Sequence, residues 1–321
     1  MGKRKNALTL QPAAGDNLLL FGILAAVLLT MSLLHGSFFK IGTFQGMAFQ
    51  LPEMGLLAFA MMITMITGGI NLSVIASANV SGILMAMILS QNPEGGLPVV
   101  ALAIVVGLIV SVLCGVLNGV IVAFFRVPAI LATLGVQMLL NGVCNVLTKG
   151  AVISGFPPEF LALGNGSVGL VPVPLLILIL FTIVMSVISH RLPVGEYARL
   201  YGSNPHATLF SGVDCKALLV KVYAISGFFA GLAAIVLTAR FNSAASGYAG
   251  SYLLQSVLIC VLGGVNPNGG EGRVSGVVLA LIILQAVSSG LNLLRVSPYL
   301  TMALWGAILL ASIALRLRRA S

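Results

Sequence analysis

The sequence predicts an all-α fold: a polytopic bundle of transmembrane helices that forms a single domain over residues 1–321. Two observations support this prediction. Of the 321 residues, 59% are apolar and only 7% are charged, and the mean hydropathy is +1.12. Apolar segments of about 20 residues, the length that crosses a bilayer, also follow one another along the chain. So few charges cannot cover the surface of a soluble protein of this size, which excludes the soluble globular class.

Ten spans satisfy this length requirement. Their approximate limits are 17–34, 47–67, 73–90, 98–124, 128–147, 168–189, 216–239, 248–263, 274–294 and 298–315. The eighth is short, and the third and fifth contain several polar groups, so eight or nine crossings with re-entrant pieces remain open. The first span follows a basic start like that of a signal peptide. Its apolar run is too long for one, and no convincing cleavage site follows, so we interpret it as the first helix.

Basic residues near the span ends predict the orientation, because Lys and Arg are retained on the cytoplasmic side. With the N-terminus inside, the cytoplasmic set is Lys3, Arg4, Lys5, Arg126, Arg191, Arg199, Lys216, Lys221, Arg273, Arg316, Arg318 and Arg319. The outside set is only Lys40, Lys149, Arg240 and Arg295. Both termini are therefore predicted to be cytoplasmic. The net charge of +9 follows from this orientation and from attraction to anionic lipid, so we expect no nucleic-acid partner.

The longest polar segment, Arg191 to Tyr223, separates the sixth and seventh spans. Its pattern predicts a short helix at 194–200, a turn at 202–205 and a second short helix at 206–209. Asn204 is expected to cap the second helix with its side-chain oxygen, and Pro205 suits the first turn of that helix. The residues alone leave two interpretations open, an ordinary cytoplasmic loop or a docking surface for another protein.

Glycines and small polar residues separate the second span from the third at Gly68–Val74, which reads GGINLSV. Paired glycines permit a sharp break, and Asn71 and Ser73 are expected to cap the helix that follows. Asn79 comes next, inside the third span. Small residues at 115 and 119, and again at 227 and 231, predict close helix packing.

Two later spans carry rows of polar side chains. Gln137, Asn141 and Asn145 recur every four residues and so share one helix face. Such a row is costly toward lipid, so it is expected to make interhelical hydrogen bonds or to line a water-filled path. Amides donate to hydroxyl groups and accept from them, which suits a sugar path. In the ninth span, Gln285, Ser288, Ser289 and Asn292 form a second stripe.

The segment Lys149 to Gly169 is the longest predicted outside segment, and it contains Glu159. It is interpreted either as a docking surface for a periplasmic binding protein or as an insertion without a partner. Glu53, near the start of the second span, is expected at the membrane interface, with a periplasmic gate or docking contact as the alternative.

The sequence lacks the residues that disulfide formation, catalysis and metal binding require. Cys114, Cys144, Cys215 and Cys260 show no CxxC spacing and are expected to be free packing residues. No carboxylate pair is expected at the membrane midplane, and the three histidines lie at or beyond span ends, so no catalytic residues and no metal site are predicted. No ionisable residue is expected deep inside a span, which indicates that another polypeptide supplies the energy.

Four segments, in this order, resemble the permeases of sugar-type ABC importers of the ribose, galactose and autoinducer group. GGINLSV matches the family's Gly-Gly-Ile-Asp-Leu-Ser-Val, with Asn71 in place of Asp. Pro128 and the run Ala132 to Gly135 match Pro-x-x-x-Ala-Thr-Leu-Gly. The polar segment from Gly195 to Val213 resembles the family's cytoplasmic coupling loop, with Glu196 where Arg is usual. Residues 262–272, LGGVNPNGGEG, resemble Leu-Gly-Gly-Thr-Ser-Leu-x-Gly-Gly-x-Gly.

The resemblance implies a fold like that of type II importers, in a bacterial inner membrane. It implies ABC ATPase subunits, a second permease copy or paralogue, a periplasmic substrate-binding protein and membrane lipid as partners. ATP and Mg are then bound by the ATPase subunits, and no cofactor by this chain. The alternatives are an ABC permease for nucleosides or branched-chain amino acids and, in a different class, an ion-coupled secondary carrier.

The resemblance and the polar patterns together give three sets of expected functional residues. Within a coupling loop at about 191–215, the ATPase-coupling set is Gly195, Glu196, Tyr197, Arg199, Tyr201, Gly202, Asn204, Ala207 and Gly212. The substrate-pathway set is Asn71, Ser73, Asn79, Gln137, Asn141, Asn145, Gln285 and Asn292. The set for a gate or helix break is Gly68, Gly69, Gly263, Gly264, Gly269 and Gly270.

Overall fold

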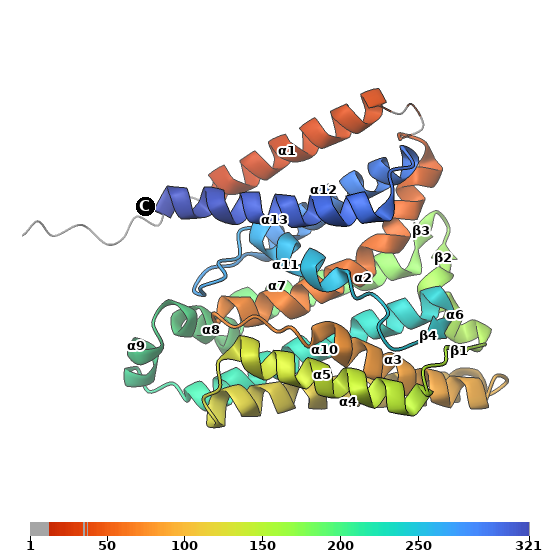
Figure 1. The fold of residues 1–321 in the computed structure, drawn as a ribbon, viewed down its shortest axis with the longest axis horizontal. Helices are drawn as coiled ribbons and strands as arrows, with labels where there is room; N and C mark the ends of the chain where they lie inside the picture. Colours follow the sequence, from red (N-terminus) through yellow and green to blue (C-terminus); the bar gives the residue numbers. More distant parts are fainter. Residues whose placement is uncertain (1–12, 35, 37, 321) are drawn as a thin grey trace, which may run out of the picture.

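The computed structural model describes residues 13–34, 36 and 38–320 as an elongated bundle of helices (Figure 1). Seven helices in this part of the chain are long and apolar enough to cross a membrane. They are α2 (Ile41–Ile66), α3 (Val74–Gln91), α4 (Gly96–Phe124), α5 (Ala129–Thr148), α7 (Val173–His190), α10 (Cys215–Phe241) and α12 (Val274–Leu293). The prediction of an all-α, multi-pass membrane protein is confirmed. Lys3, Arg4, Lys5 and His35, on which the sequence arguments drew, lie outside the described residues.

The ten predicted crossings are not confirmed, because the other three apolar helices have shorter described spans. These are α1 (Ala13–Leu34), α11 (Tyr252–Leu262) and α13 (Pro298–Ala320). α11 replaces the predicted eighth span and has only 11 residues. At 1.5 Å per residue it covers about half of the hydrocarbon core. The chain turns before it, where Gly247 and Ala249 adopt positive φ angles of 83° and 56°.

The remaining elements are short and lie between the long helices. They are α6 (Pro158–Asn165), α8 (Pro193–Ser203), α9 (Pro205–Phe210) and four strands of two residues each. β1 (Ile153–Ser154) pairs antiparallel with β4 (Ser243–Ala244), with Ile153 opposite Ala244. β2 (Ser167–Val168) pairs antiparallel with β3 (Val171–Pro172), with Ser167 opposite Pro172. The predicted outside segment therefore contains a short helix and short strands, one of which pairs with the chain after α10.

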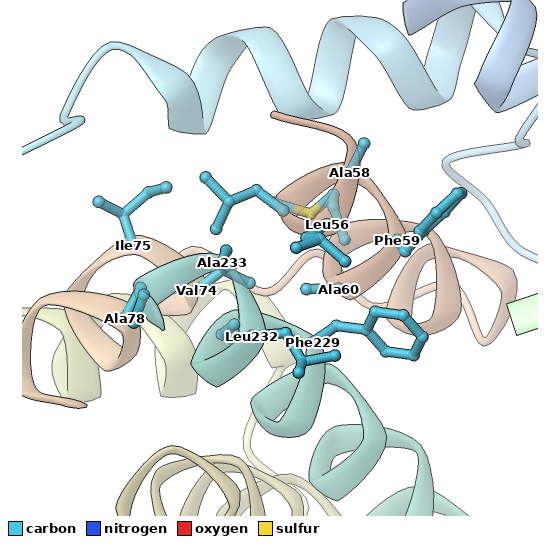
Figure 2. Packing of buried hydrophobic residues seen from close by; sticks show 14 of the residues in the cluster. Leu56, Ala58, Phe59, Ala60, Val74, Ile75, Ala78, Phe229, Leu232 and Ala233 are labelled. Atoms are coloured by element: carbon cyan, nitrogen blue, oxygen red, sulfur yellow. The ribbon is translucent and has the colours of Figure 1, made fainter. Parts of the chain in front are cut away.

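The core lies around α2 and α10, which pack against each other and are largely buried. Figure 2 shows residues of α2, α3 and α10 meeting there, and the rings of Phe59 and Phe229 pack edge to face at 5.9 Å. The predicted small-residue packing is confirmed between α4 and α10. A Cβ at Gly115 would touch the Tyr223 carbonyl and lie 3.1 Å from the Gly227 Cα. The helix backbones are thus in contact because both positions lack side chains.

The short elements gather at opposite ends of the bundle (Figure 1). We call the end with α8 and α9 the α8 end; the connections α2–α3, α4–α5 and α11–α12 also lie there. We call the end with α6 and the strands the α6 end. α4, α5 and α7 keep most of their surface exposed in this single chain, whereas α2, α3 and α10 are covered. The exposed faces are apolar, as expected for contact with lipid or with a second membrane subunit.

Candidate functional site

The polar segment forms two helices, α8 and α9, as predicted. Pro193 begins α8, and Gly195 lets it fold back on α7, because a Cβ there would touch the carbonyl oxygen of Ile188. The Asn204 side chain accepts a hydrogen bond of 3.0 Å from the backbone N–H of Ala207, so the predicted cap is confirmed. Both helices extend slightly beyond their predicted limits.

The outer face of these two helices is partly apolar although the segment is polar in composition. Glu196 and Tyr197 are exposed, as are Leu200, Leu209 and Phe210, the last with 89% of its surface accessible. Clustered exposed apolar side chains indicate an interaction surface. Sequence reasoning included Glu196 and Tyr197 but missed the other three. No signal distinguished them from apolar residues that face the core.

Two other predicted coupling residues, Arg199 and Tyr201, are half-buried and turn toward the interior of the protein. The Arg199 guanidinium donates a 2.7 Å hydrogen bond to the Ser189 hydroxyl and lies 3.3 Å from His190 Nδ1. Partial burial, together with nearby Arg273, lowers the pKa of Arg199. Tyr201 is half-buried, and burial raises its pKa. Gly195 is buried and Gly202 half-buried, whereas Asn204, Ala207 and Gly212 are exposed.

Four glycines bring three distant segments into backbone contact at the α8 end. Gly202 lies in α8, Gly68 follows α2, and Gly269 and Gly270 belong to the α11–α12 connection. A Cβ on Gly202 would overlap the Ile66 carbonyl oxygen and the Gly270 nitrogen, and one on Gly269 would lie 2.8 Å from the Gly68 nitrogen. The Gly270 N–H also donates a 2.8 Å hydrogen bond to the Ile66 carbonyl.

We call Gly68, Gly202, Gly269 and Gly270 the glycine junction. It combines one predicted coupling residue with three predicted gate residues. Gly68, Gly269 and Gly270 have positive φ angles of 79°, 94° and 86°, which glycine adopts without strain. Because no side chain separates the three backbones, α8, the end of α2 and the α11–α12 connection are in direct contact.

The other predicted gate glycines lie outside the junction. Gly69 faces the Tyr223 hydroxyl, which would be 2.6 Å from a Cβ on that glycine. Gly263 packs against Gly276 of α12. A Cβ added at Gly276 would overlap the carbonyl oxygen of Gly263. Gly264 has a positive φ of 90° in the turn that follows α11.

The chain between α2 and α3 is held by buried side-chain hydrogen bonds. The Thr133 hydroxyl accepts a 3.1 Å bond from the Leu72 N–H, and it lies 2.8 Å from the Ala129 carbonyl and 3.1 Å from the Ile70 carbonyl, either of which can accept its proton. Asn71 accepts 3.1 Å and 2.9 Å bonds from the N–H and hydroxyl of Ser73. The Asn71 amide donates at 3.0 Å to Ser226 of α10. This stretch is therefore fixed to α5 and α10.

The predicted caps on α3 are corrected by this arrangement. Ser73 occupies the N-cap position but forms no side-chain cap. Its hydroxyl instead accepts a 2.7 Å bond from Asn118 of α4, because the chain at Leu72 is held by Thr133 and turns Ser73 toward α4. Sequence reasoning assigned no hydrogen-bonding role to Asn118.

The other predicted pathway residues fall in three separate places. Gln137 and Asn141 are half-buried and Asn145 is exposed, and none of these α5 amides bonds to another side chain in the described part of the chain. The Asn79 amide is buried and donates to the Tyr248 carbonyl at 3.1 Å. Gln285 is buried and donates to Gln50 at 2.9 Å, tying α12 to α2, whereas Asn292 is exposed.

Glu53 is buried, not at an exposed interface, and this corrects the sequence interpretation. It is 1% exposed in α2, and its Oε1 accepts bonds from Arg240 at 2.6 Å and from the Tyr252 hydroxyl at 2.7 Å. The expectation of no ionisable residue deep inside a span stays a prediction. The error about Glu53 arose because residue 53 lies 13 residues into a longer α2 and is covered by the ends of α10 and α11.

At the α6 end, the segment between α5 and α7 buries two phenylalanine side chains and exposes other side chains on its outer surface. Phe156 and Phe160 are buried and their rings meet edge to face at 5.8 Å. Glu159, Val168 and Leu170 are exposed. The four cysteines are free, as predicted.

Comparison with known proteins identifies relatives along most of the chain. Residues 43–313 match the family described as branched-chain amino acid transport system, permease component. The chain is 32% identical to the ribose import permease protein RbsC of Bacillus subtilis (strain 168), over 90% of this chain and 89% of that protein. It is also 32% identical to the protein of that name from Escherichia coli (strain K12), over 90% of each.

A third relative is named for a different solute. The autoinducer 2 import system permease protein LsrD of Escherichia coli O9:H4 (strain HS) is 29% identical, over 80% of this chain and 78% of that protein. No solved structure matches the chain significantly.

Proposed function

Because this chain belongs to the family of branched-chain amino acid transport system permease components, we propose that it is the membrane-spanning subunit of an ATP-driven ABC importer. Its solute is a monosaccharide or a similar small polar molecule, since relatives matched over most of their length are named for ribose and autoinducer 2 import. The chain carries out no chemistry itself; ATP and Mg are bound by separate ATPase subunits.

The glycine junction is the observation that supports this function best. An ATPase subunit docks on the exposed face of α8 and α9 and moves α8 when it binds or hydrolyses ATP. The junction passes this movement to α2 and to the α11–α12 connection because their backbones touch Gly202. The ATPase must bind α8 and α9 differently in its two states, since equal affinity would shift no equilibrium.

The α8 end is assigned to the cytoplasm. Six basic residues belong to elements at this end: Arg126, Arg191, Arg199, Lys216, Lys221 and Arg273. Lys149 and Arg240 lie toward the α6 end. This asymmetry supports cytoplasmic termini through retention of positive charge. The surface of Glu159, Val168 and Leu170 then faces outward, where a substrate-binding protein docks.

The row of amides on α5 supports a path shared with a second permease subunit. Gln137, Asn141 and Asn145 bond to no other side chain in the described part of the chain, and such a face is costly toward lipid. It therefore meets a second copy or a paralogue and lines a water-filled path between them. Sugar hydroxyls bond there weakly, and the external binding protein supplies selectivity.

Docking of the ATPase is tested with the variant Glu196→Ala/Tyr197→Ala/Leu200→Ala. These side chains are exposed on α8, so truncation is expected to lower recovery of the ATPase subunit with the purified chain about tenfold or more. Co-purification in mild detergent, quantified by mass spectrometry, measures this. Glu159→Ala/Val168→Ala/Leu170→Ala removes similar side chains from the α6 end and serves as the matched control. Equal recovery with both variants would contradict docking on α8.

The path is tested with Gln137→Leu/Asn141→Leu, measured as ribose uptake into vesicles that contain the assembled importer. We expect uptake to fall about 30-fold, because two amides that bond to hydroxyls at roughly 1 kcal/mol each are removed. Thermal stability should change little, since neither amide bonds to another side chain in the described residues. Met138→Leu on the exposed side of α5 is the control. Full uptake by the double variant would remove α5 from the path.

A branched-chain amino acid is the second candidate solute, because the matched family is described in those words. Equilibrium binding of ribose and leucine to the partner binding protein separates the two, and nucleosides are included in the same assay. An ion-coupled carrier would instead show uptake by the purified chain alone, driven by an ion gradient and without ATP.

A further inference from the structure

A cavity of about 500 Å³ lies at the α8 end, between the α2–α3 connection, the α4–α5 connection and α9. Three basic residues line it: Arg126 after α4, His206 in α9 and Lys216 in α10. None of its lining residues is acidic, and the one ion pair among the described residues is Arg240–Glu53. Within that part of the chain, the three basic residues of the cavity thus have no acidic partner. The cavity is suited to an anion.

Further hydrogen-bond donors meet the same cavity. Tyr223 lines it and is fully buried, and its hydroxyl has no hydrogen-bond partner in the described part of the chain. Such a buried polar group is costly unless a ligand satisfies it. α5 also begins at this cavity, at Ala129, and its N-cap Pro128 provides no side-chain cap. The free N–H groups of its first turn favour negative charge.

The surroundings of the cavity indicate where the anion comes from. Phe124 and Phe125, at the end of α4, are 55% and 72% exposed, and the Lys216 ammonium lies 5.1 Å from the Phe124 ring centre. α4 and α10 are both candidate membrane spans, and the cavity lies where α4 ends and α10 begins, which is the level expected for the membrane surface. Aromatic rings beside basic residues at this level are typical of contact with lipid headgroups.

We propose that this cavity binds the phosphate group of an anionic phospholipid from the adjacent leaflet. Arg126 and Lys216 neutralise the phosphate, the Tyr223 hydroxyl donates to it, and the two phenylalanines contact the acyl chains. The bound headgroup bridges the α4–α5 connection to α10, beside His206 of α9. The proposal rests on the proposed function only in assigning this end to the cytoplasmic leaflet.

The experiment measures lipid retained by the purified chain. The chain is reconstituted in vesicles of phosphatidylcholine and phosphatidylglycerol, extracted, and examined by native mass spectrometry. The wild type is expected to retain phosphatidylglycerol in preference to phosphatidylcholine. Arg126→Gln/Lys216→Gln is expected to bind it about 30-fold more weakly, since each cation at a membrane surface contributes about fivefold. Arg191→Gln/Lys221→Gln also removes two exposed basic residues from the α8 end, but neither lines the cavity, and it should retain the lipid.

Equal retention by Arg126→Gln/Lys216→Gln and the wild type, or equal loss in the control, would overturn the proposal. Tyr223→Phe provides a second test with little risk to folding, and unchanged retention in that variant would remove the hydroxyl from the site. Inorganic phosphate is added in a further arm. If phosphate binds while phosphatidylglycerol does not, the lipid source is refuted. None of these measurements needs an ATPase or transport, so their failure is distinct from failure of the proposed importer function.

Discussion

Replacing Gly202 with alanine is expected to abolish transport while leaving the ATPase subunit able to dock. The added methyl group would overlap the Ile66 carbonyl oxygen and the Gly270 nitrogen, and it would lie 3.0 Å from the Gly269 carbonyl carbon. All three are backbone atoms and cannot turn aside as a flexible side chain does. The end of α8 must therefore separate from α2 and from the α11–α12 connection.

The expected loss is at least tenfold in ATP-driven sugar uptake, with about 1–3 kcal/mol of stability lost to overpacking. The exposed outer face of α8 stays intact, so the ATPase should still co-purify. ATP hydrolysis then continues without uptake, which is the result expected when hydrolysis is uncoupled from transport. Uptake and hydrolysis are measured together in vesicles that contain the assembled importer.

Gly306→Ala in α13 is the matched control, since a Cβ at Gly306 meets nothing within 4 Å. It should leave both uptake and hydrolysis unchanged. If Gly202→Ala transports normally, the glycine junction does not carry the coupling movement. If it loses the ATPase altogether, the substitution has disturbed docking and the transmission role is not supported.

The local elements were the most predictable from the sequence. The two helices of the polar segment and the cap at Asn204 depend on residues a few positions apart, so local patterns were sufficient. The spacing of Gly115 and Gly119 likewise predicted close packing of α4, although it did not identify α10 as the partner. The glycines of the junction were also selected individually. Their contact in space was not predictable, because Gly68, Gly202 and Gly269 are far apart in sequence. Glycine also has no side chain whose chemistry would indicate which residue it contacts.

Burial was the least predictable property. Ser73 was expected to cap α3 but accepts a bond from Asn118 instead, and Arg199 turns inward to Ser189. Phe210, by contrast, is exposed. Each outcome depends on which distant helix covers the position, and hydrophobic periodicity within one helix does not report this. Nor could length alone show that α11 covers only 11 residues, since its flanking turn residues are mostly apolar or small.

The buried carboxylate of Glu53 leads to the second large prediction, that Arg240→Met strongly destabilises the protein. Glu53 is 1% exposed, and its Oε1 accepts from Arg240 and Tyr252 while Oε2 has no partner in the described residues. Removing Arg240 leaves a buried charge with a single hydrogen bond. Loss of one member of a buried ion pair costs about 3–5 kcal/mol, and the lower value applies here because the Arg240 side chain is 20% exposed.

Thermal unfolding in detergent measures this loss, with Lys149→Met as the control, since Lys149 is exposed and has no ion pair in the described part of the chain. The double variant Glu53→Leu/Arg240→Met should recover most of the stability, because it removes both charges and leaves only the Tyr252 hydroxyl without its acceptor. A double variant as unstable as Arg240→Met alone would show that the loss comes from the contact of the Arg240 guanidinium with the Phe241 ring, whose centre lies 5.5 Å from Cζ. Recovery would instead establish that Arg240 is required mainly to compensate Glu53, and that the pair joins α2 to α10 at the α6 end.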